Sequence, residues 1–151
     1  MGEGRLVAHD LSSERLKLVQ ENCARLGVTC VQVVSGANQL KPAAVDRILV
    51  DAPCSNTGVM RRRVELRWRL CPEEIQRLRT VQLELLKQAA PLLKPGGVLV
   101  YSTCSLEPEE NRQVVDEFLK AHPAFKLEHD RELVPFVEQV DGAYVASLRS
   151  R

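Results

Sequence analysis

Two cysteines follow apolar segments that are typical of buried strands. Cys54 lies within residues 51–58, which read Asp-Ala-Pro-Cys-Ser-Asn-Thr-Gly, and Cys104 lies 50 positions later, after the apolar run at residues 98–101. A short apolar run that stops at turn residues predicts a parallel strand. Ligands bind beyond the carboxyl ends of such strands. We therefore expect both thiols at the same edge of one sheet, where such folds do their chemistry.

A thiol in this position is a candidate nucleophile. Cys104 precedes a helix that is predicted to open at residues 108–110, and the positive end of a helix lowers the pKa of a thiol. Free cysteines are also among the most buried residue types, so position alone leaves a structural role open. An odd count of five cysteines without Cys-x-x-Cys spacing argues against a disulfide framework or a zinc site, and it favours a reducing cytoplasm. No role is assigned to the other three, which are Cys23, Cys30 and Cys71.

Two aspartates end predicted strands. Asp51 follows the strand expected at residues 45–50, and Asp10 follows the strand expected at residues 5–8. Either residue could be a turn or cap residue. Nucleotide-binding sheets, however, place a carboxylate at the end of an early strand to hold ribose hydroxyls. The residues alone leave both interpretations open.

Five arginines surround a tryptophan within the long irregular segment at residues 51–70. They are Arg61, Arg62, Arg63, Arg67 and Arg69, with Trp68 among them and only Glu65 opposing them. A solvated loop is one interpretation. Guanidinium groups bind phosphate and stack on bases, and an indole stacks as well, so the cluster favours contact with nucleic acid. Trp68 could stack on a base or pack under the loop.

The bulk composition is that of an ordinary globular chain. Its 151 residues suggest a single domain, with 44% hydrophobic and 27% charged residues. The net charge of +1 predicts no global attraction to nucleic acid or membranes, so any such contact needs a local patch. No apolar stretch approaches the ~18–20 residues that span a bilayer, and no signal peptide is recognisable. We expect no membrane partner and a cytoplasmic location.

Strand and helix signals alternate along the chain. The predicted strands are residues 5–8, 28–34, 45–50, 98–102, 125–128 and 143–148. The predicted helices begin after Ser12 or Ser13, at Pro72 and at Pro108, and they end before Gly27, at residues 94–97 and before His122. This alternation predicts an α/β fold with a doubly wound, mostly parallel sheet. The last two strands are expected to be antiparallel, because no helix pattern separates them.

The two cysteine motifs together resemble the Sun (Fmu) family of RNA cytosine-5 methyltransferases. The resemblance rests on residues 51–58, on Tyr-Ser-Thr-Cys-Ser at residues 101–105 and on Glu-Glu-Asn at residues 109–111. It covers nearly the whole chain, and both motifs in this order and spacing are specific. It implies a Rossmann-like class I methyltransferase domain over residues 1–151. The implied activity is transfer of methyl from S-adenosylmethionine to carbon 5 of cytosine in RNA, with ribosomal RNA as the expected substrate.

The resemblance also implies roles for the two thiols. Cys104 would be the nucleophile, because a thiolate that adds to carbon 6 of cytosine makes carbon 5 enamine-like and able to take a methyl group. Cys54 would assist loss of the carbon 5 proton and release of Cys104. Cys54 is also the rival nucleophile, since DNA cytosine-5 methyltransferases use a Pro-Cys motif.

Four further positions are implied at the cofactor. Asp10 would hold the ribose of S-adenosylmethionine, and Asp51 would contact either the cofactor or the base. Pro53 and Asn38 complete the expected cofactor site, Asn38 being the polar residue available near the adenine.

The chain departs from the family because its first strand and Gly-rich cofactor loop have no counterpart here. That strand would lie between the strands that end at Asp10 and Asp51, so its absence leaves a gap in the sheet. We expect the gap to be closed by direct pairing, by self-association with another copy or by marginal folding. We also expect these 151 residues alone to bind S-adenosylmethionine weakly or not at all and to be inactive. A non-catalytic RNA-binding fragment is the alternative function.

Overall fold

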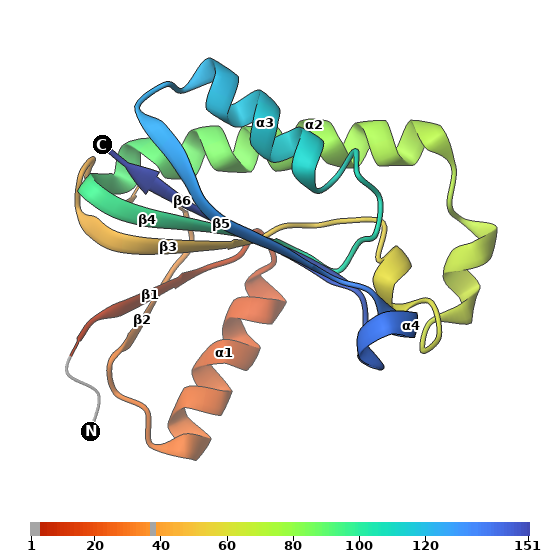
Figure 1. The fold of residues 1–151 in the computed structure, drawn as a ribbon. Helices are drawn as coiled ribbons and strands as arrows, with labels where there is room; N and C mark the ends of the chain where they lie inside the picture. The colour runs from red at the N-terminus through yellow and green to blue at the C-terminus, as the bar shows by residue number, and fades with distance from the viewer. Residues whose placement is uncertain (1–3, 37–38) are drawn as a thin grey trace. The chain divides into compact units, whose positions relative to one another are not determined.

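The chain folds into two compact units, Met1–Lys41 and Pro42–Arg151, and each is described by itself. Figure 1 shows the computed structural model, which describes residues 4–36 and 39–151. Among the helices in these described ranges, none is long and apolar enough to cross a membrane.

The first unit is a strand–helix–strand motif. It contains β1 (Leu6–His9), α1 (Ser13–Leu26) and β2 (Val31–Val34). β1 and β2 are parallel, and α1 provides the crossover that a parallel pair requires. Two sequence signals bound α1 as predicted: the Ser12 side chain accepts a hydrogen bond from the backbone N–H of Arg15, and Gly27 adopts the left-handed conformation with φ 65°.

β2 begins later than the sequence predicts. The sequence predicts the strand from residue 28, but the backbone N–H of Val28 donates to the carbonyl of Cys23 and completes the end of α1. Pairing with β1 therefore starts only at Val31, which lies opposite Leu6.

The second unit is a four-stranded sheet with its strands in the order β3-β4-β6-β5. Its elements are β3 (Val45–Asp51), η2 (Thr57–Val59), η3 (Val64–Trp68), α2 (Pro72–Ala89), η4 (Ala90–Leu92), β4 (Leu93–Thr103), α3 (Arg112–Ala121), β5 (Phe125–Leu133), α4 (Pro135–Glu138) and β6 (Ala143–Ser150). β3 and β4 are parallel, whereas β6 is antiparallel to both β4 and β5. The predicted α/β fold with antiparallel strands at the end of the chain is confirmed.

β4 includes residues that the sequence assigns to the end of a helix. Residues 94–97, Lys-Pro-Gly-Gly, are a typical helix stop, but α2 ends at Ala89 and these residues lie within β4. The register shifts at this point, since Val45 lies opposite Leu93 and Arg47 lies opposite Val98. The extra residues in β4 form a bulge, which Gly96 permits with its φ of 75°.

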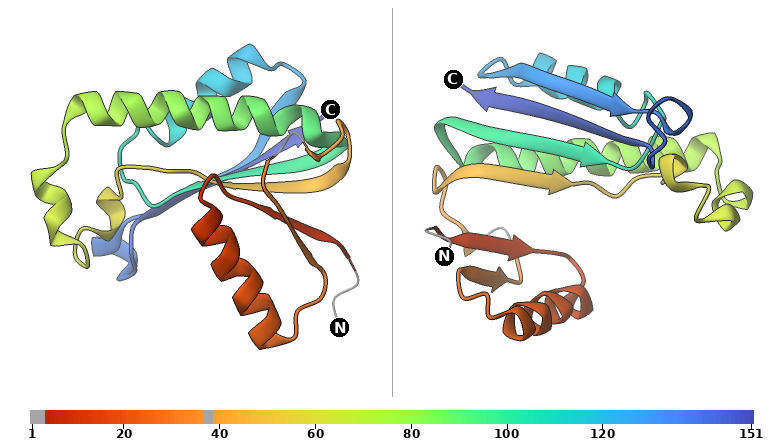
Figure 2. Two further views of the ribbon diagram at one scale, coloured as in Figure 1. Left: turned by 180° about the vertical axis from the view of Figure 1, so that it is seen from behind. Right: turned by 60° about the horizontal axis from the view of Figure 1, so that its bottom comes forward.

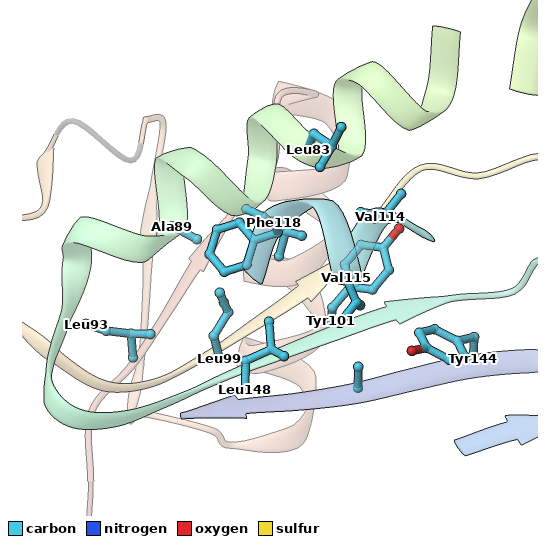
Figure 3. Packing of buried hydrophobic residues seen from close by; sticks show 13 residues of the cluster. Leu83, Ala89, Leu93, Leu99, Tyr101, Val114, Val115, Phe118, Tyr144 and Leu148 are labelled. Carbon is cyan, nitrogen blue, oxygen red and sulfur yellow. The ribbon is translucent and has the colours of Figure 1, made fainter. Parts of the chain in front are cut away.

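The core of the second unit lies between the sheet and the helices α2 and α3, which cover one face of it (Figures 1 and 2). Phe118 of α3 packs in one cluster with Leu99 and Leu148 of the strands (Figure 3). Leu86 of α2 belongs to the same cluster. Burying such a side chain contributes about 1.5–3 kcal/mol. This packing holds β3 and β4 in register, so that Asp51 lies opposite Ser102 where the two strands end.

Candidate active site at the ends of β3 and β4

The structure brings the two predicted cysteines together. Cys54 follows β3 and Cys104 follows β4, and their Sγ atoms are 3.3 Å apart. Because the two strands are parallel and in register, their carboxyl ends deliver both thiols to one edge of the sheet. Cys54 is buried, whereas Cys104 is partly exposed, so Cys104 is the more accessible of the two.

The two thiols differ in acidity. The pKa of Cys104 is lowered to about 7, chiefly by the hydrogen bond from Cys54, although burial acts in the opposite direction. The pKa of Cys54 is raised, chiefly because a thiolate there would lose its bond to Cys104 and secondly by burial. The helix end suggested by the sequence is not the main cause, since α3 begins only at Arg112. At neutral pH a substantial fraction of Cys104 is therefore a thiolate, which accepts from the Cys54 thiol.

Asn56 links the same two residues. Its Nδ2 donates to the Cys54 carbonyl at 2.7 Å, and its Oδ1 accepts from the Cys104 thiol at 2.9 Å. Asn56 adopts the left-handed conformation, φ 61°, which asparagine tolerates better than most residues. Cys104 thus has an acceptor in Asn56 when protonated and a donor in Cys54 when ionised.

A buried carboxylate ties the two cysteine loops to each other. Glu110 is fully buried, and it accepts hydrogen bonds from the Ser55 N–H at 2.9 Å, from the Ser105 hydroxyl at 2.6 Å and from the Ser55 hydroxyl. Gln82 of α2 donates to the same carboxylate at 3.1 Å and to the Pro53 carbonyl at 2.9 Å. Ser55 and Ser105 each follow a cysteine directly, so Glu110 fixes the distance between the two thiols.

The sequence interpretation missed this network. The sequence predicts Glu110 in the first turn of a helix, but residues 108–111 form the turn before α3, and the Glu110 side chain is fully buried. One sequence signal was available for its partner. Gln82 lies one helical turn after Leu78, and it is a polar residue on the buried stripe of α2.

The residues expected at the cofactor divide between the two units. Asp51 ends β3 and Pro53 follows it, and both are exposed. Asp10 follows β1, where one carboxylate oxygen accepts from the Ser12 N–H at 2.8 Å and the other lies 3.5 Å from Arg15. The turn role of Asp10 is therefore observed, and its side chain keeps one-third of its surface exposed. Asn38 lies outside the described residues.

The arginine cluster is at the surface. Arg61 and Arg62 both pair with Asp141, and Arg63 pairs with Glu65. The Trp68 side chain is 90% exposed, so the alternative in which it packs under the loop is wrong. Exposed ion pairs contribute little to stability, so these arginines can exchange their partners at small cost.

We expect the alkylation rate of Cys104 to follow its thiolate fraction. In the 151-residue chain, reaction with iodoacetamide should be half-maximal near pH 7. In Cys54→Ala the midpoint should move towards the ordinary thiol value of about 8.5, because the thiolate loses its donor. Mass spectrometry of the Cys104 peptide measures the rate, with the exposed Cys71 as internal reference. An unchanged midpoint in Cys54→Ala would show that the hydrogen bond does not control the acidity.

Comparison with known proteins relates this chain to ribosomal RNA methyltransferases. Residues 1–149 match the family described as 16S rRNA methyltransferase RsmB/F. The ribosomal RNA small subunit methyltransferase B of Vibrio cholerae is 41% identical over 97% of this chain. The probable methyltransferase of the same name from Bacillus subtilis is 33% identical over 99% of it. The chain spans 36% and 38% of the length of these two relatives.

Solved structures agree with the sequence comparison. The crystal structure of NSun6 from Pyrococcus horikoshii with SFG is 32% identical to this chain, with a TM-score of 0.86. The match covers 98% of this chain and 42% of the NSun6 chain. A SAM dependent methyltransferase from Aquifex aeolicus, 18% identical with a TM-score of 0.62, supports the fold alone, with 98% of this chain and 70% of that chain covered. The predicted class I methyltransferase fold is confirmed.

Proposed function

Because the chain belongs to the RsmB/F family of 16S rRNA methyltransferases, we propose that it supplies the catalytic cysteines for methylation of carbon 5 of a cytosine in ribosomal RNA. The single observation that carries the proposal is the pair of thiols 3.3 Å apart, one of which has a pKa of about 7. A ready thiolate beside a protonated thiol fits nucleophilic catalysis on a pyrimidine ring.

Cys104 is the proposed nucleophile. Its thiolate adds to carbon 6 of the cytosine, and the electron pair of the carbon 5–carbon 6 double bond becomes available at carbon 5 for a bond to the methyl group. S-adenosylmethionine, when bound, supplies that methyl as a sulfonium. Loss of the carbon 5 proton then restores the double bond, the carbon 6–sulfur bond breaks, and Cys104 leaves as a thiolate.

Cys54 is the proposed proton carrier, and its changing acidity supports that role. Its pKa is raised chiefly by the neighbouring Cys104 sulfur. Once Cys104 is bonded to carbon 6, its sulfur is a neutral thioether, so this cause is removed and Cys54 becomes more readily ionised. Its own proton passes to solvent, the Cys54 thiolate then takes the carbon 5 proton, and the thiol so formed can again donate to the departing Cys104. The raised pKa also disfavours Cys54 as the rival nucleophile.

We propose cofactor contacts for residues of each unit separately. Asp10 keeps an exposed part of its carboxylate and fits a ribose hydroxyl. Asp51 and Pro53 are exposed beside Cys54 and fit contacts with the cofactor or the base. Asn38 is the fourth proposed contact.

Nucleoside analysis tests the function. We expect 5-methylcytidine in ribosomal RNA incubated with S-adenosylmethionine and a hybrid enzyme, in which this chain replaces the matching segment of the V. cholerae relative. The unaltered relative is the positive control. A methylated nucleoside other than 5-methylcytidine would contradict the proposed reaction.

The 151-residue chain alone should not bind the cofactor well. The connection between β1 and α1 is short and contains no glycine, so no Gly-rich loop cradles the cofactor there. Calorimetric titration with S-adenosylmethionine should give little or no heat of binding. A dissociation constant in the low micromolar range would show that the loop is dispensable. RNA binding without cofactor binding would match the alternative, a non-catalytic RNA-binding fragment.

The arginine cluster is the proposed phosphate-binding surface. Replacing Arg61, Arg62, Arg63, Arg67 and Arg69 by glutamine should weaken RNA binding and lower its salt dependence by roughly 0.7–1 unit of log–log slope for each phosphate that is no longer bound. A matched pair of double variants sharpens the test. Arg67→Gln/Arg69→Gln should lower the slope, and Arg25→Gln/Arg77→Gln, on the two long helices, should not. Equal slopes for the two double variants would exclude Arg67 and Arg69 from the interface.

A further inference from the structure

A one-turn helix exposes apolar side chains beside the arginine cluster. Phe136 and Val137 of α4 are 84% and 71% exposed, and Val140 is exposed in the turn that follows. Single exposed apolar residues are ordinary, but three within five positions form a local apolar patch. Figures 1 and 2 show α4 beside the segment between β3 and α2, which carries the arginines.

The position of this patch is fixed by backbone contacts to the cysteine site. The Gly142 N–H donates to the Gly58 carbonyl at 2.8 Å, and the Gly58 N–H donates to the Cys104 carbonyl at 3.0 Å. A Cβ atom at Gly142 would lie 2.7 Å from the Gly58 Cα, so this approach requires glycine. The connection between β5 and β6 is therefore joined to the loop of the proposed nucleophile through a single intervening residue.

Arginines outnumber carboxylates beside the patch, since Arg61 and Arg62 share Asp141 while Arg131 pairs with Glu138 of α4. Asp141 binds Arg61 through Nε at 2.6 Å and Arg62 through Nε at 3.0 Å. One carboxylate thus holds two guanidinium groups, and both arginine side chains remain mostly exposed. Each guanidinium has five N–H donors, so the terminal nitrogens can bind further acceptors. We call Phe136, Val137, Val140, Arg61 and Arg62 together the α4 surface.

We propose that the α4 surface binds single-stranded RNA next to the target cytosine, with Phe136 stacked on an unpaired base and the two arginines on the adjoining phosphates. The inference rests on the proposed RNA substrate. Aromatic side chains flanked by guanidinium groups match the alternation of bases and phosphates in a single strand. A second copy of the chain would bring two further guanidinium groups against these two, so charge favours RNA as the occupant.

Fluorescence measurements on the 151-residue chain test the proposal. The RNA is an unstructured oligonucleotide that contains cytosine and one 2-aminopurine. Phe136→Ala should weaken binding about tenfold, as expected for loss of one stacked base, and should abolish quenching of the 2-aminopurine. Phe136→Trp should retain both. The matched control is Leu26→Ala, which removes a 62% exposed apolar side chain from α1 and should change neither signal.

Thermal unfolding and sedimentation of the same variants separate the remaining explanations. We expect Phe136→Ala to keep the melting temperature and the oligomeric state of the unaltered chain. Unchanged RNA affinity and quenching in this variant would overturn the inference and leave the proposed function standing. The inference is likewise overturned if the only effect of Phe136→Ala is dissociation of a dimer or a lower melting temperature. If the unaltered chain binds no RNA, the α4 surface fails, and nucleoside analysis of the hybrid enzyme decides the proposed reaction independently.

Discussion

Cys104→Ala in the hybrid enzyme is expected to abolish RNA methylation and every covalent RNA adduct. Without the thiolate, carbon 5 of cytosine is too poor a nucleophile to take the methyl group, and the loss should exceed about a thousandfold, since the covalent route itself is removed. Methyl incorporation into RNA and a denaturing gel of the protein measure the two effects.

Substitution of the second cysteine, Cys54, should have a different effect on the reaction. Cys54→Ala should let a covalent protein–RNA adduct accumulate, because the group proposed to take the carbon 5 proton is lost while Cys104 can still add to the ring. Cys71→Ala, at an exposed cysteine before α2, is the matched control and should behave like the unaltered hybrid. A slow-migrating adduct formed by Cys104→Ala would reverse the assignment of the two thiols.

Glu110→Ala should have the largest effect on stability. The substitution leaves two hydroxyls, the Ser55 N–H and the Gln82 amide without their shared acceptor in the protein interior. Each buried donor left without an acceptor costs about 1–3 kcal/mol, so the loss of this network removes a large part of the ~5–15 kcal/mol that stabilises a domain. Urea unfolding of the 151-residue chain measures the loss.

Two further variants test whether the loss of stability comes from the hydrogen bonds of Glu110. Glu109→Ala changes the adjacent, half-buried carboxylate and should cost little. Glu110→Gln keeps the volume and one acceptor oxygen, so it should fold better than Glu110→Ala while the pH midpoint of Cys104 alkylation still shifts, because the spacing of the two cysteine loops changes. Similar stability for Glu109→Ala and Glu110→Ala would show that the network does not hold the loops.

The meeting of Cys54 and Cys104 could be predicted because it follows from a general rule. Parallel strands bring their carboxyl ends to one edge, and each cysteine comes shortly after a recognisable apolar run. The relative acidity of the thiols could not be predicted in the same way. It depends on a 3.3 Å contact between two loops and not on the helix that follows in the sequence.

The residues that hold the site together are less visible in the sequence. Glu110 receives its hydrogen bonds from segments as far as 55 positions away, and a carboxylate is a residue type expected at the surface. The prediction that a helix ends at the Lys-Pro-Gly-Gly stretch, residues 94–97, is wrong for a related reason. Its local pattern favours the end of a helix, whereas its place in β4 is decided by pairing with β3.

The exposed apolar helix α4 also escaped prediction. Four residues are too few to show a helical period, and the assignment of the last two strands left only a connection between them. The tight contact between Gly58 and Gly142, which fixes this connection, joins residues that are far apart in the sequence. Only the folded chain shows that α4 lies beside the arginine cluster.

Mapping the covalent adduct tests the proposed reaction most directly. RNA that contains 5-fluorocytosine, incubated with S-adenosylmethionine and the hybrid enzyme, should remain attached to the protein, because fluorine replaces the carbon 5 proton that must leave before the sulfur can. After digestion, mass spectrometry should locate the nucleotide, with one added methyl group, on the peptide that contains Cys104. Attachment to the peptide that contains Cys54, or methylation of ordinary RNA without any trapped adduct, would contradict the assignment of Cys104 as the nucleophile.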